Sequence, residues 1–129
     1  MVSDHNLIVS HVFAPAPVSS DVMSLYFTIE NTGQKDDTLL TVRTAIAEHT
    51  SVHESVTEDG MTHMQALVSL PLPAGQTVEL APGGVHVMLS DLTQSISEGD
   101  TVYADLVFAS APSIALRIPV VSYADAATR

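Results

Sequence analysis

The strongest constraint on how this chain folds is an alternation of side chains with a period of two residues. It is clearest in residues 22–31, VMSLYFTIEN. One set of alternate positions is apolar throughout: Met23, Leu25, Phe27 and Ile29. The other set carries the polar side chains and begins with one apolar residue: Val22, Ser24, Tyr26, Thr28 and Glu30. Successive side chains of a strand point to opposite faces, so this pattern predicts a β-strand with one buried face.

Turn signals divide the rest of the chain into short segments. Proline, glycine and acidic residues recur about every 8 to 12 residues, which is typical of an all-β sandwich or barrel. The signals fall at 31–34, 58–60, 71–75, 81–84, 98–100 and 112. We expect about eight or nine short strands and no sustained helical period, with one possible helical turn at 92–97. In the strand expected over 38–46, we expect Leu40, Val42, Thr44 and Ile46 to point inward.

The length of 129 residues predicts a single domain over 1–129, with residues 1–4 and 123–129 frayed. Apolar residues make up 46% of the chain, which is enough for a core. The apolar runs are too short to span a membrane. Four Lys and Arg against fifteen Asp and Glu give a net charge of −11, which excludes a protein that wraps nucleic acid.

The absence of cysteine excludes thiol nucleophiles, zinc ribbons and blue-copper sites. No nucleophile elbow or closely spaced acid pair stands out, so we predict that the protein is not an enzyme.

Four residues with soft or borderline donor atoms are spaced along residues 53–88. His53 is followed by ten residues and Met64, then by twenty-one residues, His86, one residue and Met88. A thioether is a soft neutral ligand and imidazole suits copper, so the set favours Cu(I). It lacks the carboxylates that calcium or magnesium prefer, and zinc rarely accepts a thioether. Coordination by four protein atoms leaves no open position for a substrate, which favours a carrier over a catalyst.

Strand alternation supports this grouping. In residues 85–90, VHVMLS, it places His86 and Met88 on one face of a strand, which we expect to be the outer face. The intervening residues then face the core: Val85, Val87 and Leu89. His53 and Met64 flank the hairpin signal at 58–60, so pairing of 48–57 with 63–68 would bring them near each other.

The remaining histidines and methionines have simpler interpretations. Three histidines are expected to be solvated or hydrogen-bonded: His5, His11 and His49. His63 points away from Met64 on a regular strand, whereas Met61 is expected to pack near the turn and to be a reserve ligand. If the four candidate donors are also incidental, the alternative is a non-metal Ig-like binding or assembly module.

The donor spacing H-x10-M-x21-H-x-M resembles the motif of the periplasmic copper chaperones called PCu(A)C. Further landmarks agree in order: the Glu-Asp-Gly at 58–60, Pro-Ala-Gly at 73–75, Leu-Ala-Pro-Gly-Gly at 80–84 and Gly-Asp at 99–100. The resemblance covers roughly residues 5–120. It implies a cupredoxin-like Greek-key β-sandwich that binds one Cu(I) per chain through His53, Met64, His86 and Met88.

The resemblance also implies a role and a location. The role is copper delivery toward the CuA centre of cytochrome c oxidase subunit II, directly or alongside Sco-type proteins, by a monomer in the periplasm or cell envelope. The first five residues lack a basic region followed by an apolar one, so the location rests on the resemblance alone. Two departures stand out: Gln65 replaces a basic residue common after the middle Met, and residues 122–129 lack a His- and Met-rich tail.

Overall fold

The computed structural model describes residues 2–4, 6–17 and 21–126. Within these residues it has eleven strands and one short helix. The strands are β1 (Val2–Asp4), β2 (Leu7–Pro15), β3 (Val22–Asn31), β4 (Asp37–Arg43), β5 (Ala47–Glu58), β6 (Met61–Leu67), β7 (Leu70–Leu72), β8 (Thr77–Leu80), β9 (Val85–Leu92), β10 (Thr101–Phe108) and β11 (Ile114–Val121). The helix is α1 (Tyr123–Ala126). The predicted all-β fold is confirmed, with more strands than expected because β1 and β7 are only three residues long.

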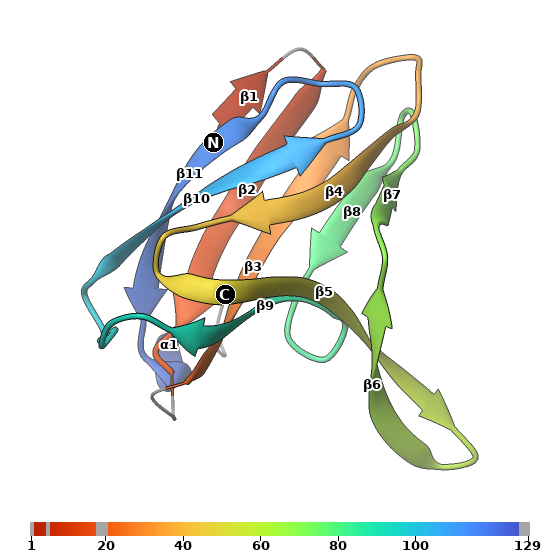
Figure 1. Ribbon diagram of the computed structural model, residues 1–129. Helices are drawn as coiled ribbons and strands as arrows, with labels where there is room; N and C mark the ends of the chain where they lie inside the picture. Colours follow the sequence, from red (N-terminus) through yellow and green to blue (C-terminus); the bar gives the residue numbers. More distant parts are fainter. Residues whose placement is uncertain (1, 5, 18–20, 127–129) are drawn as a thin grey trace.

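The strands form one hydrogen-bonded sheet that folds over into two layers. Its order is β6-β5-β9-β3-β2-β11-β10-β4-β7, with β1 paired to β2 and β8 paired to β3. The pairing of β2 with β11 is parallel, and β3 pairs with its neighbours β2, β8 and β9 in antiparallel fashion. Figure 1 shows β4 and β10 lying across β2 and β3, and all four strands contribute to one apolar core cluster. This is the arrangement of a β-sandwich.

Residues 22–31 form a strand with one buried face, as their alternation predicts. All four apolar positions of this set are buried on β3, with at most 3% of each side chain exposed: Met23, Leu25, Phe27 and Ile29. Burying one such side chain stabilises the fold by about 1.5–3 kcal/mol. Because β3 pairs through its first half with β9 and through its second half with β8, this buried face anchors the strand that carries His86.

The inward direction predicted for Leu40 is wrong. Leu40 is 46% exposed, whereas Leu39 and Val42 are buried. Between β4 and β10 the register shifts: Thr41 pairs with Val107, but Leu39 pairs with the next residue, Phe108. Leu40 is therefore an extra, bulged residue of β4. A β-bulge adds a residue to one strand only, so the inward and outward positions of the alternation are exchanged beyond it. The strand also ends at Arg43, before the predicted limit.

A short element lies near each end of the chain. Residues 2–4 form β1, which pairs with β2, and residues 123–126 form α1. Ala126 is buried against Phe13 and Val121. The fraying predicted for 1–4 and 123–129 stays a prediction, and residues 1 and 127–129 lie outside the described part. No helical turn forms at 92–97, because β9 continues to Leu92 and irregular chain follows.

A two-residue turn joins β5 to β6. Asp59 and Gly60 both have positive φ angles, of 51° and 78°. This is the backbone of a type I′ hairpin turn, which an Asp-Gly pair favours. The predicted hairpin is confirmed, with Glu58 paired to Met61 and the register regular as far as Val52 and Leu67. Figure 1 shows this hairpin projecting from one end of the sandwich. No helix in the described residues is long and apolar enough to cross a membrane.

Candidate metal centre

The pairing of β5 with β9 brings three of the candidate donors together. His53 on β5 lies directly opposite His86 on β9, and Met88 lies opposite Ser51. Residues two apart on a strand share a face, so Ser51 and His53 point the same way, and so do their partners His86 and Met88. The two imidazole rings are stacked, with their centroids 5.8 Å apart.

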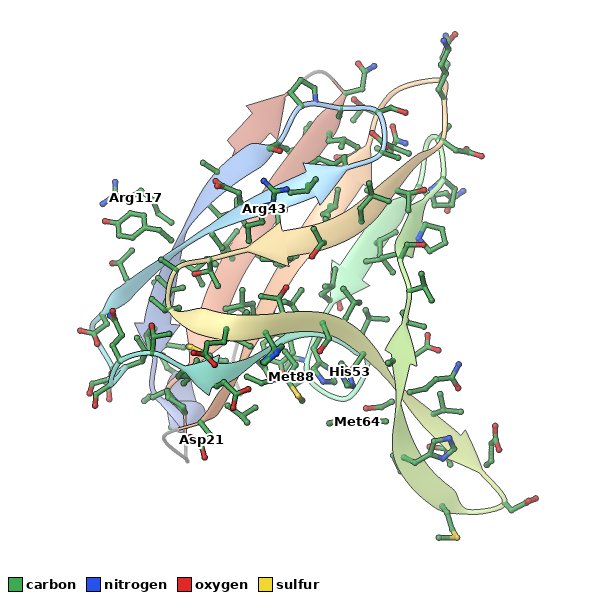
Figure 2. All side chains as sticks on the ribbon, viewed as in Figure 1. Asp21, Arg43, His53, Met64, Met88 and Arg117 are labelled. Carbon is green, nitrogen blue, oxygen red and sulfur yellow. The ribbon has the colours of Figure 1, made fainter. Side chains whose placement is uncertain are left out.

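The fourth candidate donor reaches the same face from the hairpin. Met64 on β6 lies opposite Ser55, which is two residues beyond His53 and on the same face of β5. Figure 2 shows His53, Met64 and Met88 together where the hairpin leaves the sandwich. The structure thus places all four sequence-predicted donors on one face of the three-stranded unit β6-β5-β9.

The donors differ in how much solvent reaches them. His86 is only 3% exposed, His53 and Met88 are half-buried, and Met64 is 57% exposed. The expectation that His86 lies on an open outer face is therefore wrong. Its ring is covered by the ring of His53 and by Tyr26, whose centroid lies 6.4 Å away.

Each imidazole has one nitrogen with a hydrogen-bonding partner and one without. His53 Nε2 lies 2.8 Å from Ser51 Oγ, and His86 Nδ1 lies 3.3 Å from the Gly84 carbonyl oxygen. The other two nitrogens, His53 Nδ1 and His86 Nε2, are buried and unpartnered. They are the only buried side-chain nitrogen or oxygen atoms without a partner in the described residues.

Such atoms need an explanation, because a buried polar atom without a partner costs about 1–3 kcal/mol. A metal ion that accepts the nitrogen lone pairs would remove this cost. Thioether sulfurs on the same face add soft donors, and the set of two imidazoles and two thioethers suits Cu(I). The residues present therefore fit a copper ion.

The other methionine and histidine of β6 lie on its opposite face. Pairing is regular along β6, so Met61 and His63 alternate away from Met64. The prediction for His63 agrees with this placement. Met61 is 73% exposed, so its predicted packing near the turn is wrong, and its face makes it a poor reserve ligand.

Of the remaining histidines, His49 and His11 make hydrogen bonds, as expected. His49 Nδ1 lies 2.7 Å from Asp91 Oδ2, and both side chains are well exposed. Glu48 lies beside this pair and completes the one group of three His, Asp or Glu donors found in the described residues. His11 contacts Ser10 at 3.2 Å, while His5 lies outside the described residues.

Known proteins resemble this chain in sequence. A family model described as "Putative lipoprotein LpqE-like" matches residues 7–120. The "Putative lipoprotein Lxx21020" of Leifsonia xyli is 30% identical over 108 residues, which are 83% of this chain and 65% of that protein. The chain thus spans somewhat less than two thirds of this relative.

Solved structures of copper proteins superpose on most of the chain. The copper-bound PCuAC domain from PmoF2 has a TM-score of 0.81 at 23% identity, covering 94% of this chain and 97% of that domain. The apo PCuAC domain from PmoF1 has a TM-score of 0.80 at 24% identity, covering 94% and 98%. The Cu(I) form of DR1885 from Deinococcus radiodurans has a TM-score of 0.70 at 24% identity, covering 95% and 80%.

These similarities define the class of protein. The sandwich has the cupredoxin-like Greek-key fold of the PCuAC domains, as the resemblance implies. The chain belongs to the LpqE-like family, which is the PCuAC family, and it shares the fold of the solved PCuAC domains.

Sequence reasoning missed three groups that surround the candidate donors. Ser51 contacts His53, the Gly84 carbonyl contacts His86, and the ring of Tyr26 covers His86. Ser51 could have been found, because it precedes His53 by two residues and shares its face whenever the segment is a strand. Tyr26 and Gly84 could not, since their proximity depends on how β3 and the loop before β9 pack.

Proposed function

We propose that this protein is a copper chaperone that carries one Cu(I) per chain between His53, Met64, His86 and Met88. It passes the ion toward the CuA centre of cytochrome c oxidase subunit II, directly or through a Sco-type protein. The observation that carries the proposal is the pair of buried, unpartnered nitrogens on facing imidazoles, with two thioethers on the same face.

The chemistry of the donors suits a carrier. Four neutral ligands leave bound Cu(I) with its single positive charge, which a net charge of −11 over the whole chain helps to offset. With four protein donors, no position is left for a substrate to react. The alternative, a non-metal Ig-like module, leaves the two unpartnered nitrogens without an explanation.

The graded exposure of the donors suggests how the ion is passed on. Met64 is the most exposed of the four and lies on β6, the strand at the edge of the sheet. An acceptor with soft ligands can reach the copper first at this sulfur, while His86 stays covered. We propose that release begins with exchange of the Met64 thioether.

Two features support the proposed location and oligomeric state. The family and the relative from Leifsonia xyli both carry the word lipoprotein in their names, which supports a place in the cell envelope. We propose that the protein acts there as a monomer, since the exposed edge of β6 has to remain open for the acceptor.

The site is tested by replacing one sulfur at a time. In competition against a Cu(I) chelator, Met64→Leu is expected to weaken binding by at least about tenfold, equivalent to 1.4 kcal/mol. Met61→Leu is the matched control, because Met61 is exposed on the same strand but on the opposite face, and it should bind like the wild type. Native mass spectrometry should show one copper per chain. Equal affinities of the wild type and a Met64→Leu, Met88→Leu double variant would place the copper elsewhere.

Delivery is tested separately. Cu(I)-loaded protein is mixed with the soluble apo CuA domain of oxidase subunit II, with and without an apo Sco-type protein. Metal content is then measured in each protein after separation. Copper that stays on this protein in both mixtures would refute the proposed acceptors, while leaving Cu(I) binding intact.

A further inference from the structure

The two imidazoles of the proposed copper site present different ring nitrogens. His86 offers Nε2, because its Nδ1 is engaged, whereas His53 offers Nδ1, because its Nε2 is engaged. A neutral imidazole has one nitrogen that carries a proton and one that carries a lone pair, and only the second can bind a metal. The partners of the engaged nitrogens therefore decide whether each ring can serve as a ligand.

For His86 the partner leaves no choice. The Gly84 carbonyl oxygen can only accept a hydrogen bond, so His86 Nδ1 has to donate and carries the proton. The lone pair is then on Nε2, the buried unpartnered atom. The same carbonyl also accepts the Ser55 backbone N–H at 3.4 Å, which ties the loop before β9 to β5.

For His53 the partner is a hydroxyl, which can either donate or accept. If Ser51 donates to Nε2, the proton of His53 is on Nδ1, and a buried N–H is left without an acceptor. If Ser51 accepts from Nε2–H, the lone pair is on Nδ1, the buried atom without a partner. Only the second arrangement gives both facing rings a free lone pair.

We propose that Ser51 is a positioning residue for copper binding: its hydroxyl accepts a hydrogen bond from His53 Nε2–H and holds the ring with Nδ1 as the copper donor. The inference rests on the proposed function of the site. Ser51 is well placed for this, since it precedes His53 on the same face of β5 and lies opposite Met88.

The first test needs no copper. Nitrogen-15 NMR of the side chains of the apo protein, at a pH where both rings are neutral, reports which nitrogen carries the proton. We expect opposite tautomers, with the proton on Nε2 in His53 and on Nδ1 in His86. Ser51→Ala should leave His53 as a mixture of tautomers, and Ser51→Thr, which keeps the hydroxyl, should restore the single form. A wild-type His53 with its proton on Nδ1 would overturn the role proposed for Ser51.

The second test uses Cu(I) itself. Removing a partner that orients a metal-binding histidine typically weakens metal affinity about 10–100-fold, and we expect this of Ser51→Ala in chelator competition. Ser51→Thr should recover most of the loss. Ser55→Ala is the matched control, because Ser55 is also two residues from His53 on the same face of β5, but its hydroxyl makes no hydrogen bond to His53.

The outcomes separate this inference from the proposed function. Wild-type affinity and unchanged tautomers in Ser51→Ala would refute the positioning role while leaving the copper site standing. Cu(I)-induced nitrogen-15 shifts at His53 Nε2 instead of Nδ1 would also refute it. A wild-type protein that binds no Cu(I) would refute the proposed function, and the inference with it.

Discussion

Replacing His86 with leucine should stabilise the protein without copper while abolishing the proposed copper site. His86 is only 3% exposed, and its Nε2 has no hydrogen-bonding partner. The apo protein therefore bears the cost of an unsatisfied polar atom. That cost is about 1–3 kcal/mol. Leucine has a similar volume and no polar atom, so His86→Leu removes the cost.

The substitution also loses one hydrogen bond, from His86 Nδ1 to the Gly84 carbonyl. A typical bond of this kind contributes about 0.5–1.5 kcal/mol, and at 3.3 Å this one is long. The carbonyl keeps the Ser55 backbone N–H as a donor, so no new unsatisfied group is created. The net expectation is a gain of about 1 kcal/mol, or roughly 3–5 °C in Tm for a chain of this size.

Thermal unfolding with and without Cu(I) distinguishes the two proteins. Ligand at about a hundred times its Kd stabilises a folded protein by about 2.7 kcal/mol, so copper should raise the Tm of the wild type above that of His86→Leu. The variant should not respond to copper. His49→Leu is the control, since His49 is exposed and pairs only at the surface; it should shift stability by no more than about 0.5 kcal/mol and keep the response to copper. An apo His86→Leu protein less stable than the wild type would refute the premise that Nε2 is unsatisfied.

Two further substitution pairs test the fold around the site. Leu39→Ala should destabilise the protein by about 2–5 kcal/mol in denaturant unfolding, whereas Leu40→Ala should change stability by less than about 0.5 kcal/mol; equal effects would contradict the bulge in β4. Gly60→Ala and Gly75→Ala both place a Cβ at a positive φ with no atom within 4 Å, so each should cost about 1–2 kcal/mol from backbone strain alone. Only Gly60→Ala should also weaken Cu(I) binding, because Gly60 forms the turn that positions β6 and Met64; a loss of the same size in Gly75→Ala would show that copper affinity follows overall stability instead.

The strands could be predicted because each carries its own pattern. The bounds of β3 follow from the alternation in residues 22–31, and the Asp-Gly pair at 59–60 specifies the turn of the β5–β6 hairpin. The bulge at Leu40 could not be predicted, since it is defined by the register against Val107 and Phe108 on a distant strand. The sequence signal for helix α1 is weaker. It is a serine three residues before an acidic residue, which can indicate a helix cap. In the structure the Ser122 hydroxyl accepts a hydrogen bond from the Asp125 backbone N–H at 3.1 Å.

The candidate site also has features that could be predicted from the sequence and features that could not. Spacing along the chain selected His53, Met64, His86 and Met88, and the structure brings these four to one face. Spacing could not show that His53 lies opposite His86, because residues 51–56 alternate poorly and their direction is set by pairing with β9. Nor could it show the burial of His86, which depends on Tyr26 from a third strand.

In the proposed site, the donors that would hold copper and the donor that would release it lie on different parts of the fold. His86 and Met88 lie on β9, which is paired on both sides, to β5 and to β3, so their backbone is fixed by the core. Met64 lies on β6, which in the described residues pairs only with β5 and belongs to the projecting hairpin. An edge strand of this kind opens locally at a lower free energy than a strand in the centre of a sheet. Moving the Met64 sulfur therefore requires no disturbance of β9. For the proposed site we expect copper to remain on the two histidines and Met88 while an incoming ligand replaces Met64.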